Sequence, residues 1–180
     1  MKKSHALEWS IVGAVLAVGL AFAIQKQSSF VWRSNRTPPD KATMKGLEIA
    51  IKGYQIEYNR YPLATTEEKE SVMLSEGKLL KVLMADDDEH NPRKVLFYDP
   101  IAARDGKGGY LLDSAGAPSL VDFYGQPYRI CIDYDGDGEI IDPHSKDEKQ
   151  PNTLSSGVII WSGGKDGDPT TWKDNLLSWQ

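Results

Sequence analysis

The chain of 180 residues carries 26 acidic and 21 basic side chains, for a formal net charge of -5, and it has a single cysteine. Because the basic residues are scattered among acids, the sequence offers no basic face for a nucleic-acid backbone, and no nucleic-acid partner is expected. The lone Cys131 forms no intrachain disulfide, and its apolar surroundings predict a small buried side chain. The length beyond the N-terminal segment suits one globular domain.

An uncharged apolar run, residues 9–24, follows Lys2 and Lys3 near the N-terminus. Its length lies between the core of a signal peptide and a full membrane span. The small-x-small sequence at residues 21–23 favours cleavage, whereas extension of the run through residues 6 and 7 favours retention as a membrane helix, so both interpretations stay open. In either case the two lysines predict a cytoplasmic N-terminus, with the rest of the chain on the far side of the membrane.

Glu8 lies at the edge of this apolar run. A carboxylate there costs about 2.5 kcal/mol or more if it reaches the bilayer centre, so it has either a function or a shallow position beside Trp9 at the headgroups. Gly13, Ala17 and Ala21 recur every four residues, which places three small side chains on one helix face. Such a face lets a second membrane helix approach closely.

A linker is predicted at residues 34–41, where paired prolines interrupt any helix that leaves the membrane. Asp40 or Thr43 can then cap the next helix. Over residues 47–62, apolar side chains recur three and four positions apart, which predicts an amphipathic helix that Pro62 ends. The apolar positions of this helix are Leu47, Ala50, Ile51, Tyr54 and Tyr58.

A further helix is predicted after residue 65, with an apolar stretch that continues over residues 72–84. The acidic run at residues 86–89 points its side chains in different directions, which favours a solvated loop over a metal site. Short segments of strand composition follow, separated by glycine, proline and aspartate turns. They cover residues 109–112, 121–123, 128–133, 139–141 and 158–162. The sequence therefore predicts an α+β domain over residues 42–180, with three to five antiparallel strands packed on the amphipathic helix.

The first of two acidic loops has the sequence DYDGDGEI. It places Asp133, Asp135 and Asp137 at the first, third and fifth positions of an EF-hand-like calcium loop, with Gly138 at the sharp turn. His144 takes the twelfth position, where such a loop has a bidentate glutamate, and no helix is predicted on either side. Because Asp-Gly repeats also form ordinary hairpin turns, a cation site and a plain turn are both open.

Several segments together resemble the pseudopilins of type II secretion, members of the type IV pilin-like superfamily. An apolar N-terminus with one acid, the helix LEIAIKGYQIEYNRYP, the segment DFYGQPYRI and the loop SGGKDG occur in the order typical of the major pseudopilin. The Gly-x-Pro-Tyr part of the family's Asp-Pro-Trp-Gly-x-Pro-Tyr element is intact, while Phe123 and Tyr124 replace its proline and tryptophan. The leader also differs, since Lys3, Ser4 and His5 stand where the family has a glycine and an aromatic residue.

This resemblance implies a single-pass inner-membrane protein with a cytoplasmic N-terminus and a periplasmic C-terminal domain. Its parts would be a membrane helix within residues 1–33, the linker, and a pilin-like α+β head over residues 42–180. Glu8 would meet the N-terminal amine of a neighbouring subunit, and the small-residue face would pack in a fibre. The implied partners are like subunits, other pseudopilins and the inner-membrane secretion platform.

The resemblance also implies calcium binding in the C-terminal loop, SGGKDGDPTTWKDNLLSW. The family pattern is Ser-x-Gly-x-Asp-Gly, a spacer, an acid and a short turn with tryptophan. It is matched by Ser162, Gly164, Asp166, Gly167, Asp174 and Trp179. The implied ligands are Asp166, Asp174 and Ser162, and Asp168 is the substitute within a spacer that is shortened and contains Pro169. A polar turn held only by hydrogen bonds is the alternative.

These features predict a structural, non-enzymatic subunit of a type II secretion or pilus-like fibre with a calcium-stabilised head. The alternative is a secreted or anchored periplasmic module that binds calcium or another ligand and does not assemble. An enzyme is disfavoured because His5, His90 and His144 lie in no nucleophile or metal motif. The sequence also lacks a phosphate loop, a Gly-x-Ser-x-Gly motif and a zinc pattern.

Overall fold

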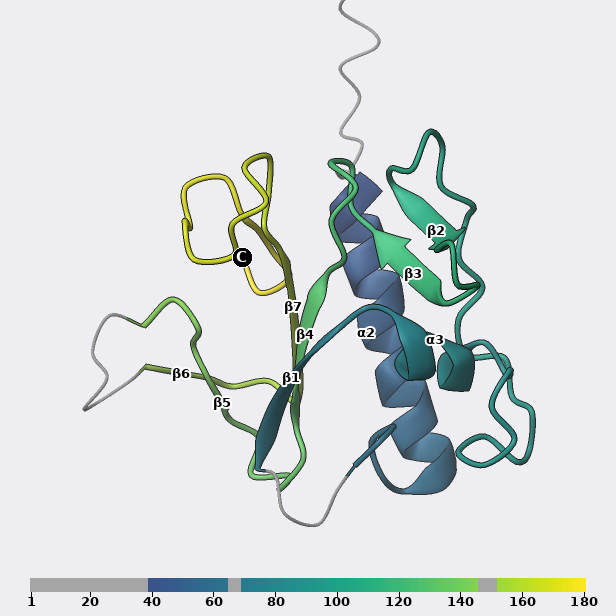
Figure 1. Ribbon diagram of the computed structural model, residues 1–180. Helices are drawn as coiled ribbons and strands as arrows, with labels where there is room; N and C mark the ends of the chain where they lie inside the picture. The colour runs from purple at the N-terminus through teal and green to yellow at the C-terminus, as the bar shows by residue number, and fades with distance from the viewer. Residues whose placement is uncertain (1–38, 65–68, 146–151) are drawn as a thin grey trace, which may run out of the picture. The chain divides into compact units, whose positions relative to one another are not determined.

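A computed structural model describes residues 39–64, 69–145 and 152–180 of the protein, which all belong to one compact unit of residues 38–180 (Figure 1). The unit combines helices with antiparallel sheets, which confirms the predicted α+β class. The predicted membrane segment, with Glu8, Gly13, Ala17 and Ala21, lies outside the described residues. Within the described ranges, no helix has both the length and the apolar character needed to cross a membrane.

Helix α2, Pro39–Tyr58, is the predicted amphipathic helix with an earlier start. It begins inside the predicted linker because proline suits the first position of a helix, where the N–H that it lacks has no partner in any case. Four of the five predicted apolar positions are buried, and the fifth, Tyr58, is half-buried. The helix ends at Tyr58 rather than at Pro62 because Asn59 adopts the left-handed conformation, with φ 54°.

The main sheet has four antiparallel strands in the order β1-β4-β7-β8. Its strands are β1, Glu70–Leu74; β4, Arg129–Asp133; β7, Val158–Ser162; and β8, Leu176–Leu177. In the register of the sheet, Cys131 lies opposite Val72 on one side and Ile159 on the other. Strands that are distant in sequence are therefore neighbours, and β1 forms one edge.

The predicted helix over residues 72–84 is wrong in its first half. Residues Glu70–Leu74 form strand β1, and only Gly77–Leu83 form a helix, α3. The apolar run is shared between two elements because β1 finds its partner in β4, about sixty residues further along the chain, and pairing of this kind overrides local helical preference. Gly77, with φ 57°, makes the turn between the strand and the helix.

The two faces of the main sheet bury different residues, since side chains alternate along each strand. Ile130, Ile132 and Ile160 point toward α2 and join the main core. Cys131, Ile159 and Trp161 point the other way and form a second buried cluster with Ile140 and Leu177. Cys131 is 3% exposed, which confirms its predicted burial, and the loss of water around the thiol raises its pKa to about 12.

Two smaller antiparallel pairs complete the unit. They are β2, Gly109–Leu112, with β3, Pro118–Val121, and β5, Ile140–Ile141, with β6, Thr153–Leu154. Strands β2 and β7 have their predicted bounds, whereas β3 begins and ends earlier than the predicted segment 121–123. The pair of β5 and β6 projects from the main sheet on the side away from α2 (Figure 1).

Candidate functional site

The DYDGDGEI loop connects β4 to β5 and is organised around Asp133, the last residue of β4. Asp133 is 2% exposed. Its Oδ1 accepts the N–H of Gly136 at 2.8 Å, and its Oδ2 accepts the N–H of Gly138 at 2.9 Å. Both glycines have positive φ, which folds the backbone tightly around this carboxylate.

The same loop brings the three predicted carboxylates together. One oxygen each from Asp133, Asp135 and Asp137 lies within 4.8 Å of the other two. Asp137 also accepts the N–H of Glu139 at 2.8 Å, and Asp135 lies 3.8 Å from the ammonium group of Lys69. Three carboxylates at this separation repel one another, and a hard divalent cation with oxygen ligands would relieve that repulsion.

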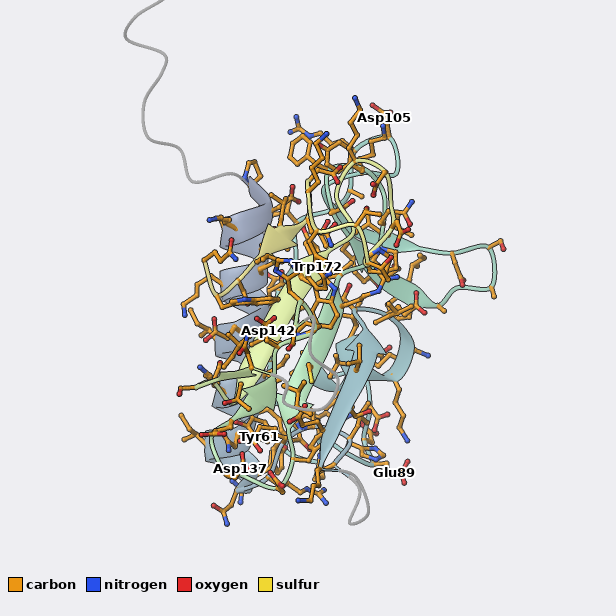
Figure 2. All side chains as sticks on the ribbon, turned by 90° about the vertical axis from the view of Figure 1, so that its left-hand side faces the viewer. Tyr61, Glu89, Asp105, Asp137, Asp142 and Trp172 are labelled. Carbon is orange, nitrogen blue, oxygen red and sulfur yellow. The ribbon has the colours of Figure 1, made fainter. Side chains whose placement is uncertain are left out.

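His144 lies away from this group of carboxylates. Its ring stacks on Trp172 of the C-terminal loop, with 4.9 Å between the ring centroids and 28° between the planes. In Figure 2, Asp137 is labelled near one end of the unit and Trp172 nearer its middle. His144, at the twelfth position of an EF-hand-like loop, therefore does not belong to the ligand group, which consists of the three carboxylates.

The C-terminal loop, residues 162–179, begins with buried Ser162 at the end of β7. The Ser162 hydroxyl donates a short hydrogen bond to Asp122 and accepts the N–H of Gly164 at 3.0 Å. Gly164 has φ 64°, and a Cβ at this position would lie 2.4 Å from the backbone oxygen of Asp174. The family-like glycine is therefore needed for the close approach of the two ends of the loop.

The carboxylates of this loop bind groups within the loop itself. Asp174 accepts the N–H of Lys165 at 2.8 Å, and Asp166 accepts the N–H of Asp168 at 2.9 Å and the hydroxyl of Thr171 at 2.6 Å. The side-chain and backbone hydrogen bonds from Thr170 lower the pKa of Asp168. Among the described residues, two groups of three ligand-type side chains converge, and neither includes Asp166, Asp168 and Asp174. Hydrogen bonds within the loop therefore engage all three carboxylates.

A buried polar network that the sequence did not reveal joins this loop to the start of α2. Asp122, fully buried in the DFYGQPYRI segment, accepts the N–H groups of Tyr124 and Gln126 at 2.8 and 2.9 Å, besides the Ser162 hydroxyl. Asp40 accepts the Tyr128 hydroxyl at 2.6 Å. The segment with the family-like Gly-x-Pro-Tyr sequence is therefore a turn held by a buried carboxylate.

Asp40, which with Thr43 was one of two predicted caps, lies inside α2 as Thr43 does, and not before the helix. It lies within the first turn of the helix, is 5% exposed, and accepts the N–H of Phe123 at 3.1 Å together with the Tyr128 hydroxyl. Burial is the main cause that raises the pKa of Asp40. Burial and the neighbouring Asp40 raise the pKa of Tyr128. The side chain stabilises contact between the helix and the turn at residues 122–128.

The acidic run at residues 86–89 is a loop in which Asp86, Asp88 and Glu89 are exposed, as predicted, whereas Asp87 is not. Asp87 is largely buried, with 13% of its side chain exposed, and its Oδ1 accepts the backbone N–H of His90 at 2.8 Å and lies 3.1 Å from His90 Nδ1. The backbone hydrogen bond from His90 lowers the pKa of Asp87. Glu89 lies 3.5 Å from the same ring, so His90 belongs to a mixed group that sequence spacing did not indicate.

A scan against protein-family models finds no matching family, and searches of curated proteins and of solved structures find no match to the chain. The functional assignment therefore depends on the residues of this chain and on the order of its motifs. The DYDGDGEI loop is the candidate site with the most convergent ligands, and the C-terminal loop is the candidate site with the family-like sequence.

Proposed function

We propose that the protein is a structural, pseudopilin-like subunit of a type II secretion or pilus-like fibre. The observation that supports this proposal is the position of α2. This amphipathic helix packs along one face of an antiparallel sheet. In the sequence it follows an apolar segment that contains one acid, and the acidic loops come after it. This order suits a protein with a helical stem and a pilin-like globular head.

In this proposal, residues 6–24 anchor the chain in the inner membrane and the head lies in the periplasm. Glu8 pairs with the N-terminal amine of a neighbouring subunit, because a carboxylate in an apolar segment requires a charged or polar partner. Gly13, Ala17 and Ala21 form the face on which neighbouring helices pack. Like subunits, other pseudopilins and the inner-membrane secretion platform are the partners.

We further propose that calcium stabilises the head. The family-like sequence favours the C-terminal loop, with Asp166, Asp168, Asp174 and Ser162 as its oxygen donors. The convergence of three carboxylates in the DYDGDGEI loop supports that loop instead. The same convergence is the observation that favours the alternative function, an anchored or secreted periplasmic calcium-binding module that does not assemble.

Assembly is tested by crosslinking between subunits in intact envelopes, with Glu8→Ala compared with Glu8→Asp. We expect Glu8→Ala to remain in the membrane fraction but to lose crosslinked products, while Glu8→Asp retains them because the negative charge is kept. The mass of the N-terminal peptide identifies an intact, pilin-type or signal-peptidase product. Equal crosslinking of both variants, or a soluble periplasmic product that starts at Ile24, would contradict the proposal.

A further inference from the structure

Strand β1 leaves one edge of the main sheet unpaired within the described part of the chain. Two hydrogen bonds flank β1: Tyr134 N–H donates to the Lys69 carbonyl, and Ser75 N–H donates to the Tyr128 carbonyl. In the register of the sheet these are directly opposed pairs, so the hydrogen-bonded pairs of the β1–β4 ladder lie at odd-numbered β1 residues. Because such pairs alternate in an antiparallel ladder, the backbone groups of Glu70, Val72 and Leu74 point away from β4.

A cavity of about 310 Å³ lies beside this edge, on the sheet face opposite α2. Cys131 and Trp161, which are 3% and 4% exposed, belong to its buried part, and Val72 and Ile141, which are 58% and 49% exposed, line its open part. Glu70 also lines the cavity. The volume is at the lower end of the range for small-ligand pockets, about 300–1,000 Å³, and it is large enough to admit a large apolar side chain.

One added strand could both pair with the backbone of the β1 edge and fill the cavity with a side chain. A strand added next to β1 would form backbone hydrogen bonds with Val72, and every second side chain of that strand would point to the same sheet face as the Val72 side chain. A large apolar side chain at such a position reaches the cavity, because neighbouring side chains on one face of paired strands lie about 5 Å apart. A small free molecule would leave the edge groups of β1 unused.

The charge around the cavity is negative. Residues 133–142, which connect to the sheet beside β1, contain five acids and no basic residue, and Glu70 lies opposite Asp133 in the register. The described basic neighbours are Lys69, at 3.8 Å from Asp135, and Arg129 of β4, which lies opposite Leu74 and Trp161 in the register, so acids outnumber basic residues there. Electrostatic complementarity therefore favours an occupant with basic residues on either side of its apolar one.

We propose that β1 is a docking edge for an extended segment of another protein, which adds a strand to the sheet, places an apolar side chain in the cavity and carries basic flanking residues. This inference goes beyond the structural role proposed above, because neither membrane anchoring nor calcium binding requires this edge. The partner is recognised by its backbone and its charge pattern, as in other cases of strand addition to a sheet edge.

The test uses the 180-residue chain in the presence of a chelator and a fluorescent peptide, Ser-Lys-Thr-Phe-Thr-Lys-Ser, with measurement of anisotropy. Its lysines and phenylalanine occupy alternate positions, so in an added strand they point to the same sheet face as Glu70 and Val72. Val72→Pro removes the N–H that points outward and keeps the β1–β4 ladder, because its pairs lie at the neighbouring odd-numbered residues. We expect it to weaken binding about fivefold to tenfold. Val72→Thr keeps both the N–H and the branched shape, and it should bind like the native chain.

Two further comparisons test the cavity and the charge. Ile141→Ser removes an apolar wall and should weaken binding, whereas Leu112→Ser, at a similarly exposed position in β2, should leave it unchanged. Glu70→Gln should weaken binding of the lysine-flanked peptide about threefold and strengthen binding of a glutamate-flanked peptide, because the substitution removes one negative charge. Thermal unfolding of each variant shows whether the fold is kept. If Val72→Pro does not fold, the native chain is tested instead with two peptides. One peptide has its odd-numbered backbone amides methylated and the other its even-numbered ones. We expect one of the two peptides not to bind, because its methylated amides are those that would pair with β1.

Several results would overturn the inference. The first is that the native chain shows no saturable binding, and the second is that the lysine-flanked and glutamate-flanked peptides bind equally well. The third is that the affinity is unchanged in both Val72→Pro and Ile141→Ser. A native dimer that Val72→Pro converts to a monomer would assign the edge to a second copy of this chain rather than to another protein.

Discussion

The two acidic loops have similar compositions but use their carboxylates differently. In the DYDGDGEI loop, acids at alternate positions of a tight turn between two strands converge on one another. In the C-terminal loop, Asp166 and Asp174 are eight residues apart and accept hydrogen bonds from the loop itself. Carboxylates of both loops accept N–H groups of their own loop. The comparison teaches that alternate spacing in a short turn also brings the acids close to one another, whereas acids far apart in a long loop do not converge as a group.

The largest effect is expected from Asp122→Ala, which breaks the support of the C-terminal loop and leaves the DYDGDGEI loop intact. The substitution leaves the part-buried N–H groups of Tyr124 and Gln126 and the buried Ser162 hydroxyl without their acceptor. We expect the free energy of unfolding to fall by about 3 kcal/mol or more. Denaturant unfolding measures the loss, and Asp122→Asn, which keeps one acceptor oxygen, should lose less. Equal stability of Asp122→Ala and the native chain would show that the network is unimportant.

Calcium binding separates the two loops directly. A ligand that binds only the folded state, at about 100 times its dissociation constant, stabilises by roughly 2.7 kcal/mol. We expect calcium to raise the unfolding temperature of the native chain and of Asp166→Ala, and to have little effect on Asp135→Ala, because only the first loop has convergent ligands. The reverse pattern would place the ion in the C-terminal loop, and an unshifted native chain would remove calcium from the proposal.

A pH titration sharpens the contrast between buried and loop carboxylates. Burial raises the pKa of Asp40 above the ordinary value of 3.8, so the folded state holds the proton more tightly than the unfolded state. The Asp40 contribution to stability is then fully present below pH 3.8 and is lost as the pH rises through the raised pKa.

We therefore expect the free energy of unfolding of the native chain, relative to Asp40→Asn, to decline as the pH rises above 3.8. Chemical denaturation at several pH values measures this difference. Asp168→Asn is the control, because hydrogen bonds lower the pKa of Asp168 and the sign of its dependence is opposite. A difference between the native chain and Asp40→Asn that stays constant with pH would contradict the assignment.

The smallest effect is expected within the C-terminal loop. Thr171→Val removes an exposed hydroxyl that donates to Asp166 at 2.6 Å, and we expect a loss of about 1 kcal/mol or less. Hydrogen exchange should become faster in the loop and stay unchanged in the DYDGDGEI turn. Thr153→Val, at an exposed position in β6, provides the matched control. Faster exchange in both loops would indicate a wider disturbance than the lost hydrogen bond explains.

Local pattern predicted the parts of the fold that depend on neighbours in sequence. The three-and-four spacing of Leu47, Ile51 and Tyr54 is sufficient to identify the buried face of α2, and β2 and β7 keep their predicted bounds because turn residues flank each of them. The one-three-five spacing in DYDGDGEI likewise anticipated the convergence of its carboxylates, since that turn is closed by its own residues.

Features that depend on distant partners could not be predicted in this way. Val72 and Met73 lie in a strand because Cys131 and Ile130 pair with them, and no local signal records that pairing. The sequence around Asp122 predicts an ordinary exposed turn residue. In the structure Asp122 is buried, because Ser162 of β7 lies beside it. The edge of β1 and its cavity depend on strand pairing and on side-chain packing between distant segments. They could therefore be identified only from the folded structure.

The stacked rings of His144 and Trp172 have an optical consequence. His144 follows the DYDGDGEI segment and Trp172 belongs to the C-terminal loop, so this contact, with 4.9 Å between the ring centroids, connects the two regions that differ in their use of acids. Any ion or partner that moves one loop against the other alters the surroundings of this indole. The protein therefore contains its own fluorescent reporter, and the difference in emission between the native chain and Trp172→Phe follows the relative position of the two loops without an added label.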